Sequence, residues 1–232
     1  MVTSLDALVS ATADDTARIV YISGTVSGDA VVKVGSNKSI LGKDSSASLE
    51  GVGLRILKKS NVIIRNIQIS KVLGKTCWNF WTGGTASNYA WVDHVDLSFD
   101  RDHDKDYFDG LLDITHGSDY VAVSFSHLHD HWKCSLVGHS DSSTVEDTGN
   151  LTVTYSHNYF ENINSRAPSY RFGTGHIFNN YFESVSDGIN TRDGAQLLVE
   201  NNVFEDVKKP LYSTDDGYAV ASGNAGNILT PG

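Results

Sequence analysis

The chain has 232 residues, of which 40% are hydrophobic and 20% are charged, and its formal net charge is −10. This length and apolar content allow a substantial core, which excludes a disordered protein, and the acidic balance argues against a general nucleic-acid binder, whose affinity rests on neutralising phosphates. No apolar run is long enough to cross a membrane, and residues 1–8 lack the basic and apolar regions of a signal peptide.

The first predicted element is a short helix over residues 5–17, where Leu5, Leu8 and Val9 recur at helical spacing. After it the pattern changes to the alternation that is typical of half-buried strands. The chain also has 21 glycines but only 3 prolines, a balance that suits tight turns between short strands. Six segments show the alternation: 61–69, 89–97, 120–128, 151–160, 176–182 and 197–204.

The last three of these segments share a repeated motif. Asn158-Tyr-Phe-Glu161, Asn180-Tyr-Phe-Glu183 and Asn202-Val-Phe-Glu205 recur every 22 residues. This period predicts a parallel β-helix, in which stacked asparagines form a column that can hydrogen-bond from coil to coil. An antiparallel β-sandwich also has many short strands, but its turns are not expected to repeat a polar column.

Six aspartates crowd residues 100–113, and the segment ends with Asp109 and Asp113. Such clusters are tolerable where oxygen ligands hold a hard cation such as calcium. In an extended strand the two carboxylates would lie about 13 Å apart on one face. One ion can bind both only if the chain bends, which Gly110 permits. A solvated acidic loop without an ion fits the same residues.

The segment from His129 to Asp141 follows. His129 and His131 have the spacing of a metal-binding pair, but no third soft ligand is evident, which argues against zinc. Lys133 beside Trp132 fits a lysine whose aliphatic stem covers apolar surface. The two cysteines, Cys77 and Cys134, are too few to define a disulfide framework, so they are either paired or reduced.

Residues 166–171, Arg166-Ala-Pro-Ser-Tyr-Arg171, place two arginines on a stiff frame. Pro168 fixes its own φ and restrains the residue before it. Two guanidinium groups five residues apart on this frame can grip two carboxylates. They can equally pair with the excess acid of the protein itself.

Together these motifs resemble the pectate lyases of polysaccharide lyase family 1. Trp91-Val-Asp-His94 resembles the WxDH signature, and residues 166–171 resemble the RxPxxR signature. Residues 109–113 are similar to the calcium strand between the signatures, and residues 131–141 to the next strand. The resemblance runs from about residue 2 to residue 220 and favours secreted fungal members. It implies an all-β fold: a right-handed, single-stranded parallel β-helix with a short N-terminal helix, forming one domain over residues 1–232.

The resemblance also implies a function. It implies calcium-assisted β-elimination of α-1,4-linked polygalacturonate by a secreted monomer. Arg166 corresponds to the base that removes the C5 proton, Lys133 and Arg171 to substrate-binding cations, and Asp109 and Asp113 to calcium ligands. Trp91, Asp93 and His94 are expected to be structural.

The sequence departs from the family in residues 74–86. Relatives usually carry a calcium-binding aspartate there, in a motif like G-D-A-I-x-I, whereas this chain has Cys77, Trp78 and Asn79. The change leaves two alternatives open: a pectin lyase that acts on methylated polymer without calcium, or a non-catalytic β-helix protein that binds polysaccharide. A polygalacturonase would hydrolyse through clustered aspartates and would not need Arg166 as a base.

Overall fold

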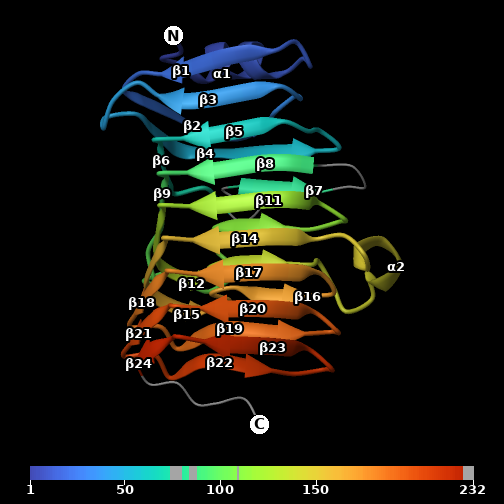
Figure 1. Cartoon of the computed structure of the whole chain (residues 1–232). Helices are drawn as coiled ribbons and strands as arrows, with labels where there is room; N and C mark the ends of the chain where they lie inside the picture. Colours follow the sequence, from blue (N-terminus) through green and yellow to red (C-terminus); the bar gives the residue numbers. More distant parts are fainter. Residues whose placement is uncertain (74–79, 84–87, 109, 227–232) are drawn as a thin grey trace.

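The computed structural model describes residues 1–73, 80–83, 88–108 and 110–226. Its strands stack in coils along one axis, with α1 at one end and β24 near the other (Figure 1). Every strand pairing in the described residues is parallel, which confirms the predicted right-handed parallel β-helix. In chain order the elements are α1 (Leu5–Thr12), β1 (Arg18–Ile22), β2 (Thr25–Lys33), β3 (Lys38–Gly42), β4 (Ser48–Leu57), β5 (Val62–Arg65), β6 (Gln68–Ser70), β7 (Phe80–Gly83), β8 (Asn88–Asp93), β9 (Asp96–Ser98), β10 (Leu112–Ile114), β11 (Asp119–Ser124), β12 (His127–Lys133), β13 (Ser135–Val137), α2 (Thr144–Asp147), β14 (Thr152–Ser156), β15 (Tyr159–Ser165), β16 (Ser169–Arg171), β17 (Thr174–Phe178), β18 (Tyr181–Glu183), β19 (Asp187–Arg192), β20 (Gln196–Glu200), β21 (Val203–Glu205), β22 (Lys209–Ser213), β23 (Tyr218–Ser222) and β24 (Ala225–Gly226).

Three faces of the helix follow from the strand order. One sheet runs β1-β3-β5-β8-β11-β14-β17-β20-β23. The other two meet at β4, a ten-residue strand that pairs with β6 through its first half and with β7 through its second half. From β4 one sheet continues through β9, β12 and β15, and the other through β10, β13 and β16. Each coil therefore contributes one strand to each face.

Alternating side chains build the core inside these faces. Strands place successive side chains on opposite sides, so each strand sends its apolar set inward. Phe160, Phe182 and Phe204, one from each of three coils, are buried and stacked with ring centroids 4.7 Å apart in both pairs. The 22-residue spacing of the phenylalanines is thus the repeat of the coil itself.

The predicted asparagine ladder is confirmed. The Nδ2 of Asn158 donates to the Oδ1 of Asn180 at 3.0 Å, and Asn180 donates in the same way to Asn202 at 2.9 Å. The glutamates of the repeated motif lie outside, where Tyr181 donates to Glu205 at 2.6 Å. The asparagine and phenylalanine of the motif therefore point into the core, and the tyrosine and glutamate point outward.

The N-terminal helix is shorter than predicted. Ser4 caps α1 by accepting the N–H of Ala7 at 3.4 Å, but the helix ends at Thr12 instead of residue 17. Asp14 accepts the N–H of Thr16, a local bond of the kind that competes with helix formation. The buried ammonium group of Lys38 binds three backbone carbonyls in this region, at 2.6, 2.6 and 3.0 Å. The prediction from spacing alone missed these polar contacts.

Candidate active site

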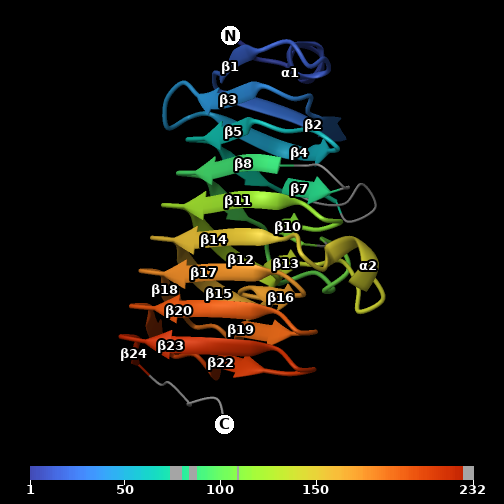
Figure 2. The same cartoon turned by 45° about the vertical axis from the view of Figure 1, so that its right-hand side comes forward.

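One face of the helix is formed by β7, β10, β13 and β16 (Figure 2). Asp113 and Arg171 lie on these strands, and Lys133 and Arg166 lie at the edge of the face, at the end of β12 and just after β15. Asp113 is in register with Leu136, and Leu136 with Ser169, on three successive coils. Tyr170 points into the core, where its hydroxyl donates to backbone carbonyls. Because neighbours on a strand alternate, Asp113, Ser169 and Arg171 point outward on this face. Residues 58 positions apart in the sequence therefore share one surface.

Asp113 lies on the floor of this surface, on β10. It is 1% exposed, and its Oδ1 accepts the N–H of Leu136 at 2.8 Å. A Cβ on Gly110 would lie 2.7 Å from both carboxylate oxygens, so a side chain at this position would collide with them. Gly110 therefore lies close to the carboxylate of Asp113, and a larger residue at position 110 would force this carboxylate to shift.

Lys133 and Arg166 come from neighbouring coils. Lys133 is in register with Ser165, and the N–H of Ser135 donates to the carbonyl of Arg166 at 2.7 Å. Lys133 forms an ion pair with Asp106, which is 63% exposed. The ammonium group of Lys133, and to a lesser extent the guanidinium of Arg166, holds the pKa of Asp106 below its usual range. In the sequence Asp106 belongs to the acidic segment 100–113, and no motif there assigns it to this pair.

Arg171 is held by two carboxylates. Its Nε lies 2.7 Å from Asp141 and 3.0 Å from Asp193. A second arginine, Arg192, is in register with Arg171 and binds the same two carboxylates, at 3.2 Å each. The structure thus shows Arg171 paired with the protein's own acid, whereas its binding of a substrate carboxylate stays a prediction. Arg192 carries no motif in the sequence, and only the strand register reveals it.

Several predicted features lie outside the described residues. These are Asp109, Cys77 and most of the atypical segment 74–86, of which only the backbone of β7 is described. The backbone of β7 pairs with both β4 and β10. Cys134 is buried and forms no disulfide. Its burial, and to a lesser extent the nearby charge of Asp113, raises the pKa of its thiol.

The WxDH signature lies on a different face, on β8. Asp93 is 1% exposed and accepts from the hydroxyl of Ser124 at 2.6 Å, and Ser124 in turn accepts from the indole of Trp91 at 2.9 Å. His94 and Arg65 contact the other oxygen of Asp93 at 2.7 and 3.1 Å. These bonds tie neighbouring coils together on the nine-stranded sheet, away from β10, β13 and β16.

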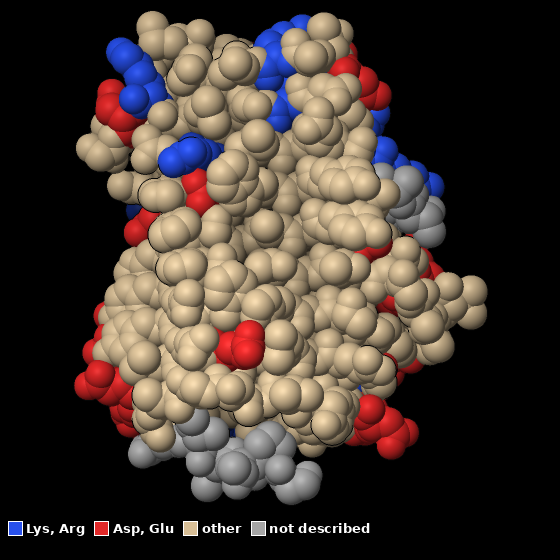
Figure 3. All heavy atoms as spheres, in the orientation of Figure 1, with Lys and Arg blue, Asp and Glu red and all other residues tan. Residues whose placement is uncertain are grey.

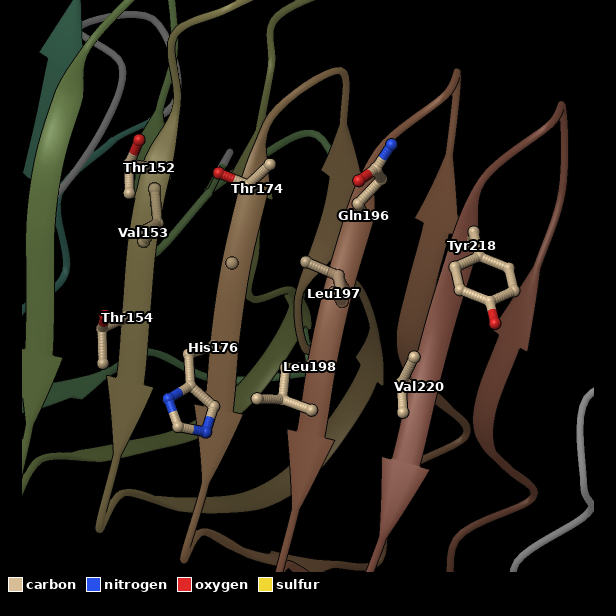
Figure 4. Close-up of a pocket in the computed structure, with 11 residues that line it drawn as sticks. Thr152, Val153, Thr154, Thr174, His176, Gln196, Leu197, Leu198, Tyr218 and Val220 are labelled. Atoms are coloured by element: carbon tan, nitrogen blue, oxygen red, sulfur yellow. The ribbon is translucent and has the colours of Figure 1, made fainter.

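The outer face of that nine-stranded sheet carries little charge. Figure 3 shows it almost free of lysine, arginine, aspartate and glutamate side chains. A shallow pocket on β14, β17, β20 and β23 is lined mainly by threonine and aliphatic side chains (Figure 4). Its one histidine, His176, contacts Glu200 at 3.0 Å. None of the residues that line this pocket is a lysine or an arginine, in contrast to the region of Lys133, Arg166 and Arg171.

A parallel β-helix with arginine, lysine and carboxylate side chains at one side of its coils has the architecture of a polysaccharide lyase. The family model described as pectate lyase matches residues 3–230. Pectate lyase A of Aspergillus niger is 62% identical over 224 residues, which cover 96% of this chain and 69% of that protein. Pectate lyase A of Emericella nidulans is 60% identical, with 96% and 68% covered.

Solved structures agree. A pectate lyase from Bacillus sp. N165, solved in complex with trigalacturonate, is 31% identical with a TM-score of 0.81, over 91% of this chain and 74% of that one. A pectate lyase from Xanthomonas campestris is 28% identical with a TM-score of 0.77, over 98% and 79%. The chain therefore belongs to the pectate lyase family. It is an enzyme that cleaves polysaccharide, and the alternative of a non-catalytic binding protein is not favoured.

Proposed function

We propose that the chain cleaves polygalacturonate by calcium-assisted β-elimination, with Arg166 as the base. The observation that carries the proposal concerns four residues at one side of the helix. Asp113 and Arg171 lie on the face of β10, β13 and β16, whereas Lys133 ends β12 and Arg166 follows β15, where the chain turns into this face. Three cations in one region give an acidic protein a place to bind an acidic polymer. The substrate class agrees with the trigalacturonate bound to the Bacillus relative. Extracellular action is part of the proposal, by analogy with the fungal relatives.

The proposed chemistry begins with the removal of the C5 proton of a galacturonate residue by Arg166. The electrons of the C5–H bond form a C4–C5 double bond, and the C4–O4 glycosidic bond breaks. The oxygen leaves with the bond electrons and takes a proton from solvent, and the new chain end is a 4,5-unsaturated uronide. Lys133 and Arg171 bind uronate carboxylates and oppose the charge that develops beside C5.

Arginine is an unusual base, because it is normally protonated. Cations nearby disfavour its charged form by repulsion. Asp106 contacts Lys133, and its carboxylate lies close enough to Arg166 to feel its charge. A substrate carboxylate that binds Lys133 would take the place of Asp106 in this ion pair. The side chain of Asp106 would then be free to leave Lys133. Asp141, which is 62% exposed, forms an ion pair with Arg171 that a substrate carboxylate would replace in the same way.

Calcium fits the residues around Asp113. The carboxylate points outward on β10, and the glycine at position 110 leaves its oxygens room. Asp109 is the second proposed ligand. Calcium takes carboxylate oxygens in flexible geometry, and a bound ion supplies positive charge for the substrate carboxylate. In the remaining steps the residues of the chain bind the polymer, orient it and accept the proton.

The first test is the ultraviolet absorbance of unsaturated uronide released from polygalacturonate, with calcium or with chelator. A rise that requires calcium supports the proposal. A rise that persists in chelator and is larger on methylated pectin would instead identify a pectin lyase. A protein that folds but releases no unsaturated product from either polymer would contradict the proposed reaction.

Replacing Asp113 by asparagine should raise the calcium concentration for half-maximal activity about tenfold or more, because the ion loses a charged ligand. Asparagine keeps the oxygen that accepts the N–H of Leu136, so the fold should persist. Asp119→Asn is a matched control, since the Oδ1 of Asp119 also accepts a backbone N–H, from Thr152 at 2.7 Å. Calcium titrations of the reaction rate compare the three proteins. An unchanged calcium requirement in Asp113→Asn would remove this residue from the site.

A further inference from the structure

A second group of chemically active side chains lies on the face formed by β9, β12 and β15. Asp96, His127 and His129 each offer one ligand atom, and these atoms all lie within 4.8 Å of one another. His127 and His129 are two residues apart on β12, so both point outward, and Asp96 on β9 is in register with His127. All three side chains are partly exposed, which leaves them open to an ion from solvent.

This group differs from the histidine pair noted in the sequence. Asp130 has a φ of 54°, which breaks the alternation between His129 and His131. His131 consequently turns inward and is fully buried, while its Nδ1 lies 2.8 Å from the carbonyl of Lys133. The third ligand that the sequence did not reveal comes from a neighbouring coil, 33 residues before His129.

The distances suit a small metal ion. The carboxylate of Asp96 lies 3.6 Å from the Nδ1 of His127 and 3.3 Å from the Nε2 of His129. Two ligands of a tetrahedral zinc ion are separated by about 3.3 Å, given bonds of about 2.0–2.1 Å. The two imidazole rings are stacked, with centroids 4.0 Å apart, so their lone pairs do not yet point at one ion. Rotation of each ring about χ2 would bring the lone pairs together, and this torsion has a broad energy minimum.

The other nitrogen of each imidazole is held by a further carboxylate. The Nε2 of His127 lies 2.9 Å from Glu161, and the Nδ1 of His129 lies 2.8 Å from Asp130. Metal-binding histidines nearly always have such a partner, which fixes the tautomer and the direction of the ring. Glu161 and Asp130 are 40% and 45% exposed, so their side chains can follow the imidazole rings when these rotate towards an ion.

We propose that Asp96, His127 and His129 bind a divalent transition-metal ion such as zinc, separately from the calcium site. Two imidazole nitrogens and one carboxylate oxygen are ligands for zinc, whereas calcium prefers six to eight oxygens. The ion would join β9 to β12 across two coils and leave a fourth position for water. Lys133 is at the opposite end of β12 from His127, so the ion would stabilise the coils without contacting substrate.

Without an ion, the same groups form a hydrogen-bonded network. Burial opposes charge on Asp96, but the bonds from His127 and His129 outweigh it and keep the pKa of Asp96 well below its usual range. Burial likewise opposes charge on His129, but Asp96 and Asp130 raise the pKa of its imidazole to about 9. An ion must therefore displace a proton from His129, and the titrations belong at mildly alkaline pH.

The test is a titration of the untagged, metal-free full chain with Co²⁺, followed by visible absorption, and with Zn²⁺, followed by calorimetry. We expect one ion per chain, cobalt bands of tetrahedral intensity, a higher melting temperature with zinc, and no displacement by millimolar calcium. His127→Gln and His129→Gln should each weaken zinc binding at least tenfold and abolish the rise in melting temperature. Circular dichroism confirms that the variants fold.

His176→Gln is the matched control, because His176 is also an outward imidazole on a strand but contacts a single glutamate. It should bind zinc like the unaltered chain. Absence of saturable binding, or binding that His127→Gln and His129→Gln leave intact, would overturn the proposal and leave only the hydrogen-bonded network. These readouts do not involve polygalacturonate, so they are independent of the proposed lyase reaction.

Discussion

Replacing Arg166 by lysine should reduce turnover of polygalacturonate about 10²–10⁴-fold, the usual contribution of a positioned base. Lysine keeps the charge, but its single ammonium group does not reach as far from the backbone as the outer nitrogens of a guanidinium group. A displacement of about 1 Å at the reacting atoms is enough for a loss of about 10². Because Lys133 and Arg171 are unchanged, KM should change much less than kcat. Initial rates of ultraviolet absorbance give both constants.

Arg18→Lys is the control for Arg166→Lys. Arg18 is an exposed arginine near the N-terminus that pairs with Asp14 at 3.2 Å, so its replacement should leave turnover unchanged. Urea denaturation and calcium calorimetry check that Arg166→Lys folds and still binds the ion. If Arg166→Lys retained turnover within threefold of the unaltered chain, Arg166 would not be the base.

Replacing Asn180 by leucine should lower the free energy of unfolding by about 4 kcal/mol. Asn180 is 2% exposed, and its side chain makes four hydrogen bonds: two from Asn158, one to the carbonyl of Tyr155 and one to Asn202. Leucine matches the volume but leaves buried polar groups without partners, at about 1–3 kcal/mol each. Urea denaturation at equilibrium measures the loss.

Asn224 provides the comparison, because it is the next asparagine of the same ladder but is partly exposed. It also accepts from Asn202 and donates to a backbone carbonyl, at 3.0 and 2.8 Å. Water can replace these bonds near the end of the stack, so Asn224→Leu should cost much less than Asn180→Leu. If both variants lost the same free energy of unfolding, the burial of an asparagine would not determine how much it contributes to stability.

The fold was predictable because the sequence repeats. Asparagine, tyrosine, phenylalanine and glutamate each recur at one place in the coil, and their 22-residue period matches the stacking of Asn180 on Asn202 and of Phe182 on Phe204. The end of α1 was not predictable from spacing, since it depends on Asp14 and on the buried Lys38, whose partners come from several segments.

The candidate site is a prediction that rests on motifs. Lys133, Arg166, Arg171 and Asp113 follow from the family resemblance, and the strand register places Asp113 and Arg171 on one face, with Lys133 at the end of the neighbouring strand β12. Arg192 could not be found in this way, because only its pairing with Arg171 reveals it. For the same reason the sequence did not reveal Asp96 as a partner of His127, because the two residues are neighbours on the sheet but distant in the chain.

The asparagine ladder also limits how the length of this protein can evolve. Asn158 and Asn202 each bind a partner 22 residues away from them, whereas Asn158 binds the backbone of Ser126 across 32 residues. The longer interval includes the loop that carries α2, so additional residues are accommodated between strands without disturbing the column. A single residue inserted within β15 or β18 would instead exchange inner and outer side chains. Genetic change can thus add or remove whole turns, or lengthen loops, more readily than it can insert one residue into a strand that belongs to the ladder.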